Sequence, residues 1–120
     1  MDSETKINEL KEKVKKFSEE RDWNQYHNPK DLAIGIITEA SELLEHFRFK
    51  SEKEAEEMLK DSKKRNELSE ELADILYFVL RLAQKYDIDL TDELNKKMKK
   101  SHKKYPLEKA KGSNKKYSEF

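Results

Sequence analysis

The stretch ELSEELADILYFVLRLAQKY, residues 67–86, decides the fold of this chain. Its apolar residues recur every three or four positions, which is the period of an α-helix, and they form one stripe of Leu68, Leu72, Ile75, Val79, Leu82 and Ala83. Two acidic residues border that stripe, because Glu71 falls between it and Phe78, and Asp74 flanks it. The segment predicts a long amphipathic helix with carboxylates beside its core-facing side.

A second acidic pair occupies a similar place in residues 31–48. As a helix, this segment has an apolar stripe of Leu32, Ala33, Ile36, Ala40, Leu43, Leu44 and Phe47. Glu39 falls on the edge of the stripe, and Glu42 lies one step further out. A carboxylate facing a core is costly unless its charge is compensated, and four converging carboxylates also repel one another. A bound cation would resolve both problems, whereas pairing with lysines and arginines is the open alternative.

The residue types narrow the choice of cation. The chain has no cysteine, and its three histidines form no pair at ligand spacing. Hard oxygen ligands of this kind favour Mg²⁺, with Mn²⁺ as a second choice, over zinc or copper. A di-iron site is excluded because no Glu-x-x-His motif is present.

The composition and the small number of glycines and prolines predict an all-α protein. With 120 residues, of which 34% are hydrophobic and 43% charged, the chain forms one domain with a thin core that self-association would enlarge. Only two glycines and two prolines interrupt the helical period. No apolar run suits a membrane span and no signal peptide is apparent, so we expect a cytoplasmic protein with no membrane partner.

The expected helices are four long ones and a short one, at roughly residues 3–21, 29–48, 51–60, 67–86 and 91–104. Ser51 with Glu54 has the form of a capping box, and Thr91 is a candidate cap for the last helix, which Pro106 should stop. Residues 107–120 form a C-terminal tail that is disordered by default. Its apolar residues Leu107, Tyr117 and Phe120 are candidates for docking on a neighbouring surface.

Basic residues edge the last predicted helix. Between residues 95 and 116 there are ten lysines and a single acid, although the formal net charge of the whole chain is zero. Lys97, Ser101 and Lys104 lie along one edge of an inward stripe that is formed by Leu90, Leu94, Met98 and Tyr105. Acids on two helices and bases on a third suit a phosphate-bearing ligand, with a solvated lysine face as the alternative. Zero net charge argues against nucleic acid as the partner.

Aromatic residues supply a surface on which a nucleobase can stack. Those near the acids in sequence, or on the same helices, are Trp23, Tyr26, Phe47, Phe49, Tyr77 and Phe78. Phe47 suits the core, whereas Trp23 stands in a polar loop. His27 and His46 are candidates for a phosphate contact or a general base, or they have a structural role.

Several stretches together resemble a known family. The pattern Glu-x-x-Glu, then 28 residues, then Glu-x-x-Asp is similar to that of the MazG-like nucleoside triphosphate pyrophosphohydrolases. The surrounding sequence resembles the dCTP pyrophosphatase branch of that family over nearly the whole chain. The stretches that carry this resemblance are RDWNQYHNP at 21–29, FRFKS at 47–51, EELADILYF at 70–78, KKYP at 103–106 and KGSNKKYSEF at 111–120.

The resemblance implies a Mg²⁺-dependent enzyme in which residues 1–106 form a four-helix MazG-like bundle with a short extra helix. It implies a homodimer or homotetramer that hydrolyses dCTP, or a modified dCTP, to the monophosphate and pyrophosphate. The metal ligands would be Glu39, Glu42, Glu71 and Asp74, and Glu42 and Glu71 are the catalytic candidates. The residues expected to contact the substrate are Trp23, His27, Phe49, Phe78, Lys97, Ser101, Lys104 and Tyr105.

Four departures from that branch concern the substrate pocket. Phe49 stands where tryptophan is common, Phe78 where tyrosine is, Ser101 where asparagine is, and Val14 where the first helix often has histidine. Base selectivity is therefore open. The alternatives are a MazG-like hydrolase of other canonical or damaged nucleotides and a non-catalytic helical interaction protein.

Overall fold

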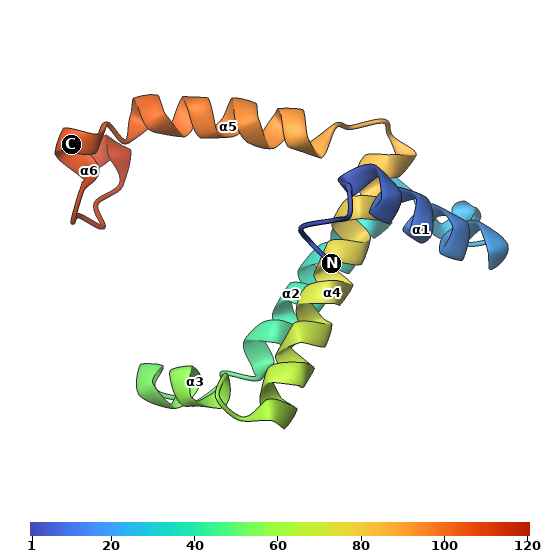
Figure 1. The fold of residues 1–120 in the computed structure, drawn as a ribbon, viewed down its shortest axis with the longest axis horizontal. Helices are drawn as coiled ribbons and strands as arrows, with labels where there is room; N and C mark the ends of the chain where they lie inside the picture. Colours follow the sequence, from blue (N-terminus) through green and yellow to red (C-terminus); the bar gives the residue numbers. More distant parts are fainter. The chain divides into compact units, whose positions relative to one another are not determined.

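A computed structural model describes residues 1–120, and every regular element in it is helical (Figure 1). The α-helices are α1 (Ile7–Glu20), α2 (Pro29–Glu45), α3 (Glu52–Met58), α4 (Ser62–Lys85), α5 (Leu90–Lys104) and α6 (Leu107–Ala110), and the 3₁₀ turns are η1 (Asn24–Tyr26) and η2 (Tyr117–Glu119). The prediction of an all-α fold is confirmed. None of the helices combines the length and the apolar character that crossing a membrane requires. The chain divides into two compact units, Met1–Asp87 and Ile88–Phe120.

The first unit is built around α4, which packs against both α2 and α1. Figure 1 shows α2 and α4 side by side. The pair is antiparallel, because His27, just before α2, bonds Arg81 near the end of α4, while His46, just after α2, contacts Glu71 nearer its start. The fully buried apolar side chains are Leu32, Leu68, Leu80 and Ala83. Burying each leucine contributes about 1.5–3 kcal/mol, so this core is small.

A polar contact joins α1 to α4. Ser18 is fully buried, and its hydroxyl donates to the carbonyl of Val14 at 2.7 Å. The same hydroxyl lies 2.6 Å from the phenol oxygen of Tyr77. A buried hydroxyl is tolerated only when it is hydrogen-bonded, and these two contacts satisfy Ser18.

Gly35 allows α2 and α4 to approach closely. A Cβ atom at this position would stand 2.5 Å from Cδ1 of Phe78, which is well inside van der Waals contact. The ring of Phe78 therefore lies directly on the backbone of α2. Glu39 follows Gly35 by about one helical turn, so this close approach also brings Glu39 near α4.

The helix boundaries differ from the predictions where capping residues decide them. α5 begins at Leu90 because the carboxylate of Asp89 accepts from the backbone N–H of Asp92 at 2.9 Å, so the prediction of Thr91 as the cap was wrong. α4 begins earlier than predicted, after the cap Asp61. Its first turn, SKKRN, lacks apolar residues but is rich in lysine and arginine, which favour helices. The capping box of Ser51 and Glu54 is confirmed.

Part of the predicted core stripes is exposed within this chain. Leu44 is 70% exposed and Leu72 57%, so their assignment to the core of a single chain was wrong. The physical reason is that α2 and α4 bury only the faces that meet each other, and those faces are narrower than the apolar stripes. Ile34, Ile37 and Leu76 are exposed as well. We call these five residues the outer apolar face.

The second unit contains α5, α6 and η2. The ring of Tyr105 packs edge-to-face against Tyr117 and Phe120, with 5.9 Å between ring centroids in both pairs. Two of the three predicted docking residues of the tail therefore pack on the end of α5, whereas Leu107 is 74% exposed.

Candidate functional site

Three of the four predicted carboxylates gather between α2 and α4. One oxygen each of Glu39, Glu42 and Glu71 lie within 4.8 Å of one another. Residues 39 and 42 share a face of α2 because they are three positions apart, and the antiparallel packing brings Glu71 beside them. Asp74 lies outside this group, but its charge still acts on Glu39. We call Glu39, Glu42 and Glu71 the acidic cluster.

The electrostatics of the acidic cluster disfavour three negative charges. The pKa of Glu39 is raised from 4.5 to about 7. Burial is the largest cause, followed by a hydrogen bond with Glu42 and by the negative charges of Glu42, Asp74 and Glu71. Oε2 of Glu39 and Oε2 of Glu71 are both buried without a hydrogen-bond partner. Leaving such an oxygen unsatisfied costs about 1–3 kcal/mol. The cluster is therefore short of positive charge and of hydrogen-bond donors.

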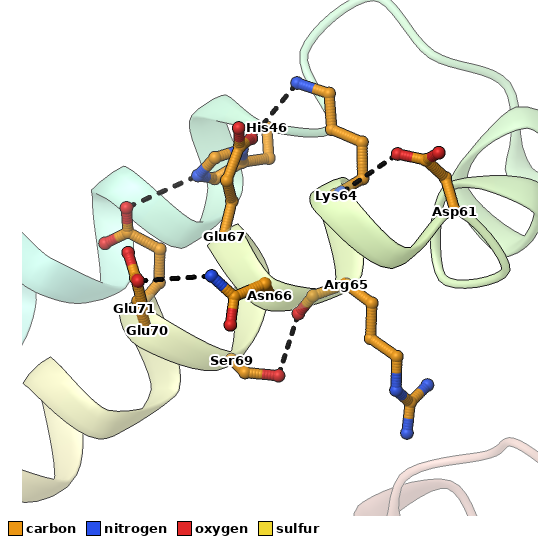
Figure 2. Close-up of polar contacts among 9 residues, drawn as sticks. All are labelled: His46, Asp61, Lys64, Arg65, Asn66, Glu67, Ser69, Glu70 and Glu71. Carbon is orange, nitrogen blue, oxygen red and sulfur yellow. Dashed lines mark hydrogen bonds and ion pairs between the residues drawn. The ribbon is translucent and has the colours of Figure 1, made fainter.

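His46 holds one oxygen of Glu71. Figure 2 shows its imidazole between Glu67 and Glu71 of α4. Nε2 of His46 lies 3.3 Å from Oε1 of Glu71, and Nδ1 lies 3.9 Å from Oε2 of Glu67. Glu67 also accepts from Nζ of Lys64 at 3.2 Å. A contact of this kind fixes the orientation of a carboxylate, so His46 supports Glu71 and leaves its other oxygen unpaired.

The acidic cluster fits a divalent cation. Its donor atoms are all carboxylate oxygens, the ligands that Mg²⁺ and Mn²⁺ prefer. The two unpaired buried oxygens are where a cation would compensate the missing charge. The alternative of pairing with lysine or arginine is not realised here, because the cluster's ion pair is the contact between Glu71 and His46.

Two of the aromatic residues predicted to contact the substrate, Trp23 and Phe49, are exposed in the first unit. Trp23 is 38% exposed, and its ring lies edge-on to Phe17 and 6.2 Å from the imidazole of His27. Phe49 is 91% exposed and has a φ of 61°, a left-handed conformation that is strained for a bulky side chain. Within this chain the guanidinium of Arg48 lies 4.8 Å from the ring centroid of Phe49, a cation–π contact. Phe78 is half-buried against Gly35.

The remaining predicted substrate residues belong to the second unit. Lys97 is exposed on α5 and lines a shallow depression of about 300 Å³ with four other charged residues. Nζ of Lys104 lies 4.7 Å from the ring centroid of Tyr117, a cation–π contact. Ser101 is half-buried, and its carbonyl accepts from the backbone N–H of Tyr105 at 2.8 Å. These four residues share the C-terminal half of α5 and its cap.

The structure adds two residues, Arg81 and Lys85, that were not among the predicted site residues. Arg81 is 1% exposed, and both side chains donate hydrogen bonds to the segment 24–27 between α1 and α2. The available signal was an arginine inside the apolar run YFVLRLA at 77–83. A fully buried arginine is rare unless it is paired.

Comparison with known proteins places these features in a family context. The profile of the MazG-like family matches residues 34–120. The chain is 36% identical over 104 residues to dCTP pyrophosphatase 1 of Mus musculus, covering 87% of this chain and 61% of the relative. It is 32% identical over 118 residues to dCTP pyrophosphatase 1 of Bos taurus, covering 98% and 70%. The chain thus spans about three fifths of the length of the mouse relative.

A solved structure has the same fold. The crystal structure of a pyrophosphatase from Archaeoglobus fulgidus matches with a TM-score of 0.78 and 37% sequence identity. The match covers 83% of this chain and 92% of the archaeal one.

Proposed function

The chain belongs to the MazG-like family, and from this membership we propose that it hydrolyses a nucleoside triphosphate to the monophosphate and pyrophosphate. The preferred substrate in this proposal is dCTP or a modified dCTP, which the names of the mouse and bovine relatives support. The observation in this chain that carries the proposal is the acidic cluster with its two buried, unpaired oxygens.

In this proposal, Mg²⁺ is held by Glu39, Glu42 and Glu71, with Asp74 as a further ligand, and Mn²⁺ can replace it. Bound there, the cation supplies charge neutralisation for phosphate oxygens and lowers the pKa of a bound water. The support is the carboxylate donor set and the raised pKa of Glu39. A divalent ion compensates the repulsion among the carboxylates that raises this pKa.

The chain's own residues have separate roles. Glu42 is the exposed member of the acidic cluster, so it is suited to orient the attacking water and accept its proton. Glu71 is held by His46 and is suited to a fixed position at the reacting centre. The water attacks the α-phosphorus, and pyrophosphate is the leaving group.

The substrate is bound by two groups of residues in this proposal. Trp23, Phe49 and Phe78 surround the base and sugar, and His27 is a further substrate contact. The high exposure of Phe49 supports an aromatic contact with a ligand. Lys97, Ser101, Lys104 and Tyr105 contact the phosphates and the leaving pyrophosphate. Phenylalanine at 49 and 78 lacks the polar atoms of tryptophan and tyrosine. The selectivity for cytosine therefore needs a panel of nucleotides to define it.

We also propose that the protein is a homodimer or homotetramer. The outer apolar face includes Ile37, which is 68% exposed, and Leu44, which is 70% exposed. A second copy of the chain would remove these side chains from water, and each would gain about 1.5–3 kcal/mol if it became fully buried. A cytoplasmic location, without nucleic-acid or membrane partners, completes the proposal.

The test is incubation of the purified protein with Mg²⁺ and a panel of deoxy and ribo triphosphates, including 5-modified dCTP, with products separated by chromatography. We expect monophosphate and pyrophosphate, with dCTP fastest. Glu71→Gln should abolish turnover, whereas the matched control Glu70→Gln, an exposed neighbour on α4, should not. Turnover by Glu71→Gln at the wild-type rate would contradict the role of the cluster. No turnover of any nucleotide by the wild type would favour an interaction protein.

A further inference from the structure

Arg81 is a buried cation without a carboxylate partner. The residue is 1% exposed, and its guanidinium donates only to neutral groups. Nε donates to Nδ1 of His27 at 2.9 Å, one terminal nitrogen donates to Oε1 of Gln84 at 2.5 Å, and the other donates to Oδ1 of Asn24. A buried charge without a counter-ion is costly, so packing alone is a poor account of an arginine here.

Lys85, one turn further along α4, holds the same segment. Its Nζ donates to the carbonyl of Asn24 at 2.9 Å and to the carbonyl of His27. Two cations of one helix therefore contact Asn24 and His27 through four hydrogen bonds. These two residues lie in the connection between α1 and α2, directly after Trp23. The connection is fixed to α4 by side chains rather than by an apolar core.

The hydrogen bond from Arg81 determines the protonation state and the tautomer of the His27 ring. Arginine has donors and no acceptor, so the atom that receives its hydrogen bond, Nδ1 of His27, must carry a lone pair. The imidazole is therefore neutral, with its proton on Nε2. Burial lowers the pKa of His27, and the charges of Arg81 and Lys85 lower it further, which agrees with this geometry. Nε2 makes no hydrogen bond within the chain and is available as a donor.

We propose that Arg81 is a positioning residue that fixes His27 as a neutral donor through Nε2, directed at an acceptor atom on the base or sugar of the bound nucleotide. The ring centroid of Trp23 lies 6.2 Å from that of His27. Because an aromatic ring suits a base, we assign His27 to the base and sugar end of the ligand rather than to its phosphates. His27 cannot then be a general base, because Nδ1 is occupied and Nε2 already holds a proton. This inference rests on the proposed function for the identity of the ligand.

The first test does not depend on turnover. Nitrogen-15 NMR of the histidine rings at pH 7 distinguishes the two neutral tautomers from the charged ring, and His27→Asn identifies the resonances of His27 among the three histidines. We expect an unprotonated Nδ1 and a protonated Nε2 in the wild type. A charged ring, or a proton on Nδ1, would overturn the proposal.

Variants then test Arg81 itself. Arg81→Met should give a mixture of the two tautomers, whereas Arg65→Met, which replaces an exposed arginine on the same helix, should leave the pure Nε2–H form. Circular dichroism establishes that each variant is folded. If Arg81→Met does not fold, Arg81→Gln takes its place, because its amide can donate or accept and therefore no longer requires a lone pair on Nδ1. An unchanged tautomer in a folded Arg81 variant would contradict the assignment.

Kinetics give the third readout once the wild type is known to turn over. We expect Arg81→Lys to raise KM for dCTP about tenfold and to change kcat by less than about twofold, because the lost contact acts on binding. His27→Asn should raise KM similarly, and the double variant should be no worse than either single one. Additive losses, or a selective fall in kcat, would overturn the proposal. Absence of wild-type turnover would contradict the proposed function, whereas the NMR result would stand.

Discussion

Glu39→Gln should make the metal-free protein more stable at about pH 8. The carboxyl of Glu39 has its pKa raised from 4.5 to about 7, chiefly by burial and then by its carboxylate neighbours. At about 1.4 kcal/mol per pH unit, this difference corresponds to about 3 kcal/mol of unfavourable interaction of the ionised form. Solvent around the exposed Glu42 screens part of it, so we expect the substitution to stabilise the protein by about 1–2 kcal/mol.

The pH dependence follows from the direction of the pKa shift. Because the pKa of Glu39 is higher in the folded state, its contribution to stability is complete below about pH 4.5 and is lost as the pH rises through about 7. The advantage of Glu39→Gln should therefore be largest at pH 8 and shrink at pH 5. Urea unfolding in EDTA at both values measures the free energy of unfolding.

Added Mg²⁺ should reverse the order of stability. The wild type gains stability with rising metal concentration, whereas Glu39→Gln gains little, because it has lost a charged ligand. Glu45→Gln, an exposed substitution on the same helix, should stay within about 0.5 kcal/mol of the wild type in EDTA and keep its response to metal. A Glu39→Gln protein that is less stable than the wild type in EDTA at pH 8 would show that the ionised carboxylate of Glu39 does not destabilise the metal-free fold.

Three further predictions concern packing, assembly and the support of the metal site. Gly35→Ala should lower the free energy of unfolding by about 1–2 kcal/mol, because its Cβ would meet the ring of Phe78 at 2.5 Å; thermal unfolding measures this, and Phe78→Leu in the same chain should recover much of the loss. Leu44→Lys together with Leu72→Glu should shift the protein to a monomer in analytical ultracentrifugation with its helix content retained, whereas a wild type that is already monomeric would contradict the role of the outer apolar face. His46→Leu should weaken Mg²⁺ binding about tenfold in a calorimetric titration, since the orientation of Glu71 is lost, and an unchanged affinity would show that His46 does not support the ligand.

The sequence predicted those features that depend on periodicity and local chemistry. The helical period located α2 and α4, and the position of Glu39 and Glu71 beside apolar stripes indicated that they meet, as they do in the acidic cluster. The capping box at Ser51 was equally local and equally predictable. A long amphipathic helix is visible in the sequence as an apolar period of 3.6 residues, and a cap is visible as a polar residue just before the helix.

Features that depend on tertiary partners were not predictable. The apolar stripe of α2 does not reveal that Leu44 has no partner within one chain, because periodicity reports an apolar face and not what covers it. Arg81 falls in an apolar run, but two of its three acceptors, on Asn24 and His27, lie more than fifty positions away. Asp89 rather than Thr91 caps α5, because Asp89, two positions earlier, also has a side chain that can cap a helix and the backbone conformation decides between them.

The most direct test of the proposed reaction is hydrolysis of dCTP in ¹⁸O-labelled water with Mg²⁺ present, followed by mass spectrometry of the products. Attack of water on the α-phosphorus predicts that the labelled oxygen appears in the monophosphate and that the pyrophosphate stays unlabelled. Label in the pyrophosphate, or products consisting of a diphosphate and orthophosphate, would contradict the proposed reaction.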